Sequence, residues 1–480
     1  MNDKKYFLTT TLPYANSVPH VGHALEFIQA SAIKRYLMST GSEVFLNVGV
    51  DEHGEKMFNA GGGNSGLDVL KYCDEMAAKW IDFCFRFDIE FDKFYRTTSL
   101  EHQDNVQRYW QQLVENGDIY MAPYVGRYCS GCESFKTSVE LVDGICPDHP
   151  TTPITGVSEM NYFFRLSKYA KTLANGYNLA DHLITRIYPK TKRTELLNII
   201  ENAIDGSKDI SISRSAEKVS WGIPVPFDKS QTIYVWFEAL LNYLFSCGET
   251  EWNESTIIQI CGPDNIRFQG FWWQAMLMAA GCKTTDHLIV HGTVLDKNGN
   301  KMSKSLMNVL DPVELLDKHG LSSVRYYALK GLNTFENSGW AEEDQVKLYN
   351  ADLANNYGNL LARTMHLMTA HESMPRTKPH GEFEILINRS KEVYGEFMSR
   401  YDLRLALEST MALLSEGNMI MNRDRPWEPD NERRKEILSG LWWILSEATD
   451  QLSIALSAMD INNAKESLRS RAKIILFPKK

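Results

Sequence analysis

The 480-residue sequence has no long apolar run. Its densest one, Phe271 to Ala280, falls well short of the roughly 20 residues that span a bilayer. The opening stretch MNDKKYFLTTTLPYA has two lysines but no apolar core of about 7–15 residues, so it does not match a secretory signal. We therefore expect a cytoplasmic protein with no membrane partner.

A disulfide framework and an excess of positive charge are also missing. Five of the eight cysteines are scattered through ordinary sequence, and a reducing compartment suits such a pattern. The net charge of −10 argues against a protein coated all over by nucleic acid, although a local basic face would still bind RNA. Without repeats, and at a length beyond one hydrophobic core, the chain should form roughly two to four globular domains.

An α/β pattern opens the chain. Residues 5–11 are expected to form a strand, residues 24–40 a helix, and residues 43–50 a second strand that ends at Asp51. Strand, loop, helix and strand make a βαβ unit, which predicts a parallel sheet that binds ligands at the carboxyl ends of its strands.

The sequence changes character twice further along. Short segments rich in Cys, Gly, Pro and Thr between about 117 and 225 indicate an inserted domain that splits the sheet. Apolar residues recur at helical spacing from about 346 onward, which predicts a helix bundle. The expected parts are the two halves of the α/β domain at 1–116 and 226–295, the insertion at 117–225, a connecting region at 296–345, and the bundle at 346–480.

Four residues have the spacing of metal ligands. The pattern Cys129-x2-Cys132-x13-Cys146-x2-His149 supplies three thiolates and one imidazole as two close pairs, which satisfies a closed tetrahedral Zn²⁺ site. Since the protein supplies all four ligands and leaves no position for water, the pattern predicts a structural zinc.

Two short strings carry phosphate chemistry. His20-Val21-Gly22-His23 stands where the first strand gives way to the first helix, and two imidazoles at a helix N-terminus suit a nucleotide phosphate. Lys301-Met302-Ser303-Lys304-Ser305 follows a turn-rich stretch, and its lysines could neutralise charge on a departing pyrophosphate. Taken singly, the first string could equally be a pair of surface or core histidines, and the second could equally be a solvated lysine loop.

Together and in this order, the strings resemble the two signatures of class I aminoacyl-tRNA synthetases. The resemblance implies a Rossmann-type α/β catalytic domain that uses ATP and Mg²⁺. It implies that ATP is bound by His20, His23, Lys301, Ser303 and Lys304, of which the histidines and lysines are also catalytic.

Five further blocks are similar to methionyl-tRNA synthetases, in the same order: Leu12–Asn16, Asp51–Gly54, Asp209–Arg214, Trp221–Pro226 and Val235–Ala239. The resemblance implies that Asp51 binds the amino group of methionine and that Arg214 orients its carboxylate. It also implies a side-chain pocket lined by Leu12, Tyr14, Trp236, Ala239 and Tyr243. Aromatic and aliphatic walls suit a thioether, although Trp236 and Tyr243 alone would suggest a core stripe.

One block departs from the family pattern. In Cys261–Gln269, Pro263 replaces the usual lysine, Asn265 the usual isoleucine and Gln269 the usual histidine. Asn265 and Gln269 are expected to face the amino-acid side chain, and a buried amide left unpaired costs roughly 1–3 kcal/mol. Either a rearranged pocket satisfies these amides, or the substrate supplies polar partners.

Polar and aromatic residues of the helical part suit unstacked RNA bases. Asn359 and Arg363 share one helix face, and Asn418 and Trp427 add an amide and an aromatic ring. Singly they would be ordinary surface or core residues. In this register they resemble anticodon-binding residues of methionyl-tRNA synthetases, which implies a tRNA partner with a CAU anticodon.

Three functions are open at this point. The first is a methionine–tRNA ligase, favoured by the pocket and anticodon residues. The second is a paralogue that activates a more polar amino acid for a biosynthetic pathway, which Asn265 and Gln269 motivate. The third, a catalytically silent tRNA-binding protein, has no physical reason to keep both signatures. Since the chain stops at Lys480, soon after the bundle, we expect a monomer.

Overall fold

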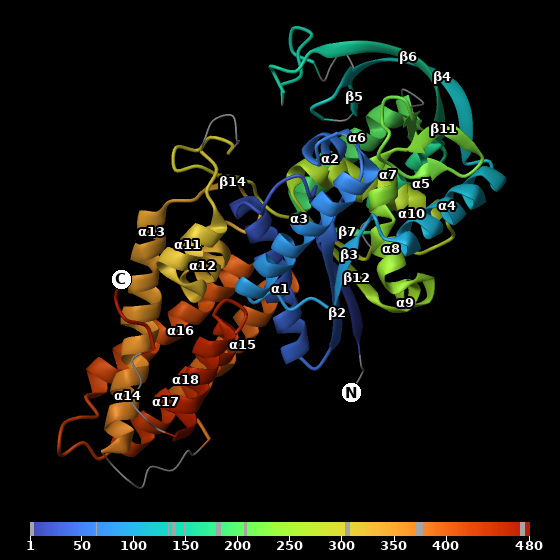
Figure 1. The fold of residues 1–480 in the computed structure, drawn as a ribbon. Coiled ribbons are helices and arrows are strands. Elements are labelled where there is room, and N and C mark those ends of the chain that lie inside the picture. The colour runs from blue at the N-terminus through green and yellow to red at the C-terminus, as the bar shows by residue number, and fades with distance from the viewer. Residues whose placement is uncertain are drawn as a thin grey trace. The chain divides into compact units, whose positions relative to one another are not determined.

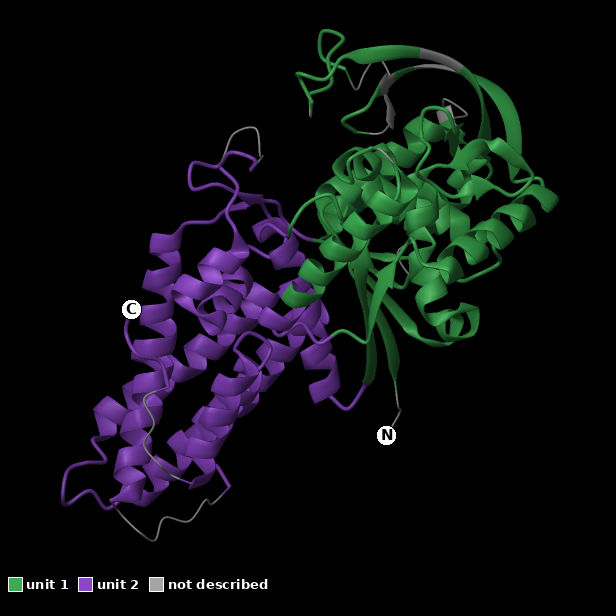
Figure 2. Cartoon of the chain, viewed as in Figure 1, with its two compact units in different colours: residues 1–18, 43–82, 91–290 green, residues 19–42, 83–90, 291–480 purple. Residues whose placement is uncertain are grey.

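The computed structural model describes residues 4–63, 65–132, 134–136, 141–147, 149–178, 184–205, 209–302, 308–370, 378–470 and 476–480. The chain forms two compact units, shown in separate colours in Figure 2. Unit 1 comprises residues 1–18, 43–82 and 91–290, and unit 2 comprises residues 19–42, 83–90 and 291–480. No described helix is long and apolar enough to cross a membrane.

Unit 1 is built on a six-stranded parallel sheet in the order β3-β2-β1-β12-β13-β7 (Figure 1). Its strands are β1 (Lys5–Thr9), β2 (Glu43–Val50), β3 (Lys93–Arg96), β7 (Arg186–Tyr188), β12 (Thr256–Cys261) and β13 (His287–Val290). The strand order reverses between β1 and β12, as in doubly wound sheets that bind ligands at this switch point. The predicted α/β class with a parallel sheet is confirmed.

Apolar side chains explain why these strands lie at the centre of unit 1. Both β12 and β2 are buried along nearly their whole length, as expected for parallel strands covered on both faces. An apolar cluster packs against the sheet, with Phe7, Trp110 and Trp252 among its fully buried rings. The helices of unit 1 are α2 (Glu55–Ala60), α4 (Leu100–Glu115), α5 (Leu166–Asn178), α6 (Lys190–Asp205), α7 (Val235–Leu240), α8 (Asn242–Cys247), α9 (Glu249–Glu254), η1 (Pro263–Asn265), η2 (Phe268–Trp272) and α10 (Trp273–Ala279). Helix α3 (Gly66–Arg86) runs from unit 1 into unit 2.

The segment expected to be an insertion contains a second, antiparallel sheet in the order β5-β4-β6-β8. Figure 1 shows β4 (Ile119–Cys129) and β6 (Ile154–Phe164) as a long curved pair. The short strands β5 (Ser134–Lys136) and β8 (Ile210–Ser211) flank this pair. Three more strands, β9 (Ser213–Ser215), β10 (Pro224–Val225) and β11 (Asp228–Ile233), form a small separate sheet. Because β7 lies in the same segment, residues 117–225 also supply the edge strand of the main sheet.

Unit 2 is mostly helical. It contains α1 (Val21–Ser39), which starts three residues before the predicted helix because His20 caps it. The other helices are α11 (Pro312–His319), α12 (Leu321–Tyr326), η4 (Tyr327–Gly331), α13 (Glu342–Leu348), η5 (Tyr349–Gly358), α14 (Asn359–Thr369), α15 (Glu382–Ser399), α16 (Leu403–Asp424), α17 (Arg434–Leu452) and α18 (Ala458–Ser470). Strands β14 (Val294–Leu295) and β15 (Ser338–Gly339) pair in parallel. The described residues after β15 contain only helices and connections, which confirms the predicted bundle.

Candidate active site

Asp51 lies directly beyond β2, at the carboxyl edge of the main sheet. Its backbone N–H donates to the Pro13 carbonyl at 2.8 Å, and its own carbonyl accepts from Ala15 at 2.9 Å. These bonds hold Tyr14 beside Asp51 as an isolated parallel bridge. The Asp51 residue is only 4% exposed, so a ligand that meets its carboxylate does so away from bulk water.

Aromatic rings surround the positions expected to hold a substrate side chain. Trp236 stacks on Phe268 with ring centroids 4.2 Å apart and meets the edge of Tyr14 at 6.0 Å. On α7, Trp236 and Ala239 are half-buried whereas Val235, Phe237 and Glu238 are buried. Trp236 packs against the apolar core of unit 1 but leaves part of its ring exposed, so it does not lie wholly within the core.

The rest of this aromatic wall was partly missed from the sequence. Tyr243 packs edge-on against Trp273, with ring centroids 5.6 Å apart, and Leu12 is 9% exposed. Phe268 and Trp273 lie in the apolar segment that follows Asn265, where the run of aromatic residues was the available signal.

Gln269 is satisfied inside the protein. It is 2% exposed on η2, its side-chain carbonyl accepts from Gln259 Nε2 at 3.0 Å, and its own Nε2 donates to the Tyr243 hydroxyl. For Gln269, the rearranged pocket is therefore the correct one of the two alternatives. Asn265 is partly exposed at the end of η1.

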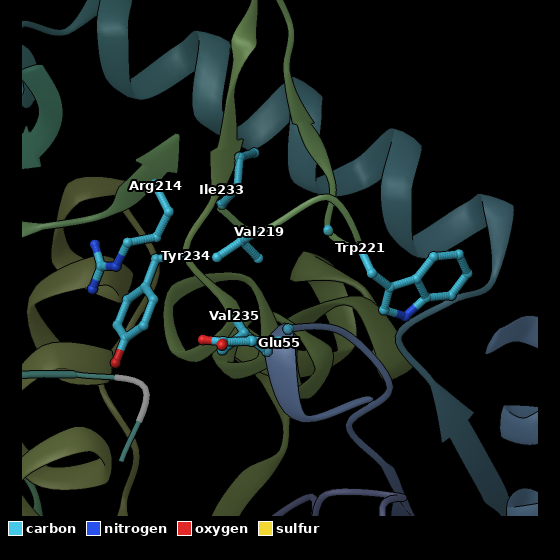
Figure 3. Close-up of a pocket in the computed structure, with 9 residues that line it drawn as sticks. Glu55, Arg214, Val219, Trp221, Ile233, Tyr234 and Val235 are labelled. Carbon is cyan, nitrogen blue, oxygen red and sulfur yellow. The ribbon is translucent and has the colours of Figure 1, made fainter. Parts of the chain in front are cut away.

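Arg214 is held by the backbone of its own segment. Its Nη1 donates to the Ser213 carbonyl at 2.6 Å and to Ser211 Oγ at 3.1 Å, while its guanidinium stacks 4.1 Å from the Tyr234 ring centroid. Figure 3 shows this stacked pair at the side of a small cavity that Trp221 borders on another side. The cavity volume is about 10 Å³, enough for about one water molecule and too little for an amino acid.

A buried carboxylate lies between two imidazoles in unit 1. Glu238 Oε1 is 2.9 Å from His53 Nδ1, and Oε2 is 2.6 Å from His102 Nε2. Burial alone would raise the pKa of Glu238, but the charge of His53 and the hydrogen bonds from both histidines lower it below its ordinary value. His102 in turn meets the Tyr95 hydroxyl at 3.0 Å. Sequence reasoning missed this cluster because its members lie far apart in the chain.

The two signature histidines lie together at the N-terminus of α1. Their rings stack with centroids 3.7 Å apart. His20 Nδ1 accepts from Gly22 N at 3.1 Å, and His23 Nδ1 accepts from His20 N at 3.3 Å. A neutral imidazole that accepts at Nδ1 carries its proton on Nε2, so Nε2 is the donor nitrogen of each ring. A Cβ at Gly22 would lie 2.9 Å from His20 Cε1, which explains the glycine.

The second signature begins at an exposed Lys301, which pairs with Leu295 as an isolated bridge. Asp296 organises the preceding turn by accepting from the backbone of Asn298 and Asn300, both at 2.9 Å, and from Asn308 Nδ2 at 2.9 Å. These bonds, that of Asn308 first, lower the pKa of Asp296. Ser303 and Lys304 lie outside the described residues.

The four predicted metal ligands converge. Their ligand atoms all lie within 4.8 Å of one another, with Cys132 Sγ 3.5 Å from Cys146 Sγ and 3.2 Å from His149 Nδ1. Tetrahedral bonds of about 2.0–2.3 Å place ligand atoms roughly 3.3–3.8 Å apart. Both separations measured from Cys132 Sγ are close to this range, so the set fits zinc. A Cβ at Gly131 would lie 2.4 Å from His149, so only glycine allows this close turn.

The structure brings together some of the expected base-reading residues. The Arg363 guanidinium lies 5.4 Å from the Trp427 ring centroid and donates to Asn422 Oδ1 at 3.1 Å. Trp427 is 41% exposed, and Asn359 is exposed at the start of α14. Asn418 instead donates to Asn356 Oδ1 at 2.8 Å, so its amide is engaged within unit 2.

Doubly wound sheets with a histidine pair at a helix N-terminus are found in class I tRNA synthetases, and comparison with known proteins agrees. The family model described as "tRNA synthetases class I (M)" matches residues 6–158 and 150–365. The chain belongs to this family. The relatives to which it is similar are methionine–tRNA ligases.

Three relatives illustrate the similarity. The methionine–tRNA ligase of Thermosynechococcus vestitus is 36% identical over 88% of this chain and 82% of its own length. That of Caldanaerobacter subterraneus subsp. tengcongensis is 34% identical over 96% of this chain and 73% of its own length. The solved structure of Mycobacterium tuberculosis methionyl-tRNA synthetase in complex with methionyl-adenylate has a TM-score of 0.87 at 29% identity, covering 96% of this chain and 93% of that one.

Proposed function

We propose that the protein is a methionine–tRNA ligase. It joins methionine to ATP, releasing pyrophosphate and forming methionyl-adenylate, and then passes the methionyl group to the terminal ribose hydroxyl of tRNA. The observation that carries this proposal is the aromatic wall of Trp236, Phe268 and Tyr14 beside the buried carboxylate of Asp51. Such a wall suits a thioether, and the carboxylate suits an α-amino group.

The proposal assigns the amino acid to residues of unit 1. Asp51 binds the ammonium group and Arg214 orients the carboxylate. The side chain is received by Leu12, Tyr14, Trp236, Ala239, Tyr243 and Gln269, with Asn265 at the margin.

Residues of unit 2 handle the phosphates in this proposal. His20 and His23 donate from Nε2 to phosphate oxygens, helped by the positive end of α1. Lys301 and Lys304 neutralise the charge that develops as pyrophosphate departs, and Ser303 donates a hydrogen bond to a phosphate oxygen. Stabilisation of the transition state at this point raises the rate. Mg²⁺ supplies charge neutralisation on the phosphates when bound.

The same proposal gives the zinc and tRNA sites their roles. Cys129, Cys132, Cys146 and His149 hold a structural Zn²⁺ that closes their turn. In the bundle, the exposed Trp427 ring and the Arg363 guanidinium above it offer a stacking surface to unstacked bases of a CAU anticodon.

Amino-acid-dependent ATP–pyrophosphate exchange across a panel of amino acids tests the proposal. Exchange with methionine is expected. Exchange with a different, more polar amino acid would favour the biosynthetic paralogue instead, and Asn265 is the remaining observation for that reading. No exchange with any amino acid would favour a tRNA-binding protein without catalysis.

A further inference from the structure

An amide stands where an apolar side chain is expected. Gln259 lies in the middle of β12, paired in register with Thr9 of β1 and Leu288 of β13, and is 1% exposed. Its strand neighbours Ile258 and Ile260 are fully buried. Placing an amide in such a position is unfavourable unless every polar atom finds a partner.

Gln259 is one link of a chain of hydrogen bonds that all run in one direction. Gln274 Nε2 donates to Thr285 Oγ1 at 3.0 Å, and the Thr285 hydroxyl donates to Gln259 Oε1. Gln259 Nε2 donates to Gln269 Oε1 at 3.0 Å, and Gln269 Nε2 donates to the Tyr243 hydroxyl. All five residues are at most 2% exposed. Bonds aligned in this way polarise one another, so the chain fixes the orientation of each amide.

The fixed orientation decides what the pocket offers to a substrate. Gln269 lies on η2, a π-helical turn, directly after Phe268 in the sequence. The Phe268 ring stacks on the Trp236 ring, so Gln269 is close to the aromatic residues of the proposed pocket. Because Gln259 occupies the side-chain carbonyl of Gln269, that oxygen is turned toward β12. The Gln269 carbonyl is therefore not offered to the substrate side chain.

We propose that Gln259 is a positioning residue that determines amino-acid specificity. By holding the Gln269 carbonyl, it makes the site select an unbranched apolar side chain over an amide of similar length, such as glutamine. The inference rests on the proposed ligase function. Without the Gln259 donor, the Gln269 carbonyl loses its partner in a buried place, and a substrate amide would supply the missing donor.

The test is ATP–pyrophosphate exchange by the full-length Gln259→Leu variant with methionine, norleucine and glutamine. The ratio of kcat/KM for methionine to that for glutamine is expected to fall roughly tenfold or more, with the KM for ATP unchanged. Gln259→His should restore the ratio, because an imidazole donates at one nitrogen and accepts at the other. Thr285→Val removes the donor to Gln259 Oε1 and the acceptor of Gln274 Nε2, so the Gln259 amide is no longer held in its orientation toward Gln269. This variant should shift the ratio in the same direction and serves if the leucine variant does not fold.

A matched control comes from unit 2. Gln345 is also fully buried. Its side-chain carbonyl accepts from Trp340 Nε1 at 3.2 Å, and its Nε2 donates to Ser323 Oγ at 3.1 Å. Gln345→Leu should lower stability without changing the ratio. If Gln259→Leu reduces exchange with all three amino acids equally, or leaves the ratio unchanged, the inference is wrong while the ligase function stands. If the wild type shows no methionine exchange, the proposed function itself fails, and the inference fails with it.

Discussion

Single residues of unit 1 show how polar groups are accommodated in an apolar interior. Gln269 and Glu238 are both buried, yet one is neutral and satisfied by an amide and a hydroxyl, and the other is charged and satisfied by imidazoles. In both cases the partner comes from a different element of the fold. The burial of each group is therefore tolerated only when the whole of unit 1 is assembled.

The Glu238 cluster makes stability depend on pH. Its two histidines outweigh burial and hold the pKa of Glu238 below the ordinary 4.5. A carboxyl whose pKa is lowered by folding stabilises the protein above its unfolded pKa, and this contribution is lost as the pH falls through the folded value. We expect the free energy of unfolding of the wild type to fall more steeply below about pH 4.5 than that of Glu238→Gln.

Urea denaturation at a series of pH values between 7 and 3, at constant ionic strength, would measure both slopes. Parallel curves for the two proteins would show that Glu238 keeps its ordinary pKa in the folded state.

At the scale of elements, close approach of the backbone limits what the main sheet tolerates. Gly49 lies in β2 opposite Tyr95 of β3, and a Cβ built on it would stand 2.1 Å from the Tyr95 carbonyl oxygen. Neither strand can withdraw without losing its ladder. Gly49→Ala should therefore destabilise the protein by on the order of 3 kcal/mol.

Gly395, within α15, is the matched control because a Cβ there meets nothing within 4 Å. Gly395→Ala should stabilise the protein by up to about 1 kcal/mol through helix propensity. Chemical denaturation of both variants separates the two effects, and equal changes of the same sign would rule out the steric explanation.

The segment from Cys129 to His149 is expected to depend on a bound metal for its order. With Cys132→Ser, one of the four converging ligands is lost, so we expect zinc content to drop and the 129–149 segment to become sensitive to protease. Metal analysis combined with limited proteolysis measures this. Val142→Ala, at a residue of the same segment that is 63% exposed and outside the ligand set, should keep zinc. Cleavage outside the segment in the serine variant would indicate general unfolding instead.

Patterns within short sequence segments predicted some of these elements but could not predict others. The strand Glu43–Val50 and the spacing from Cys129 to His149 are properties of short segments, so the sequence predicted both. The edge strand Arg186–Tyr188 has only three residues, too few for a period to show. Glu238 and His102 meet across 136 residues, and such partners are defined only by the folded chain.

At the scale of the whole molecule, tRNA binding and methionine activation are expected to depend differently on salt concentration. The chain carries a net charge of −10, so its affinity for tRNA must come from local contacts to phosphates. Each phosphate contact releases counterions, so tRNA affinity should fall by a factor of ten or more, roughly, between 50 and 200 mM salt. Methionine-dependent pyrophosphate exchange, which involves few released ions, should change little over this range.

Filter binding of tRNA and exchange assays in the same salt series would check this. Trp427→Ala should weaken tRNA binding at every salt concentration without altering the slope, because the indole stacks and carries no charge. A change in slope for this variant would contradict the stacking role.

The pairing of β1 with β12 delays completion of the main sheet while the chain is being synthesised. Tyr6 aligns with Thr256, so the central strand of the sheet waits for a neighbour made about 250 residues later. At roughly 5–20 residues per second, a ribosome needs on the order of 10–50 s to supply it. Throughout that interval the nascent chain exposes an apolar strand with an open edge, the kind of surface that other chains recruit into aggregates. Among the strands that the structure describes in the main sheet, Lys5–Thr9 is therefore where a chaperone that holds nascent chains would matter most during translation.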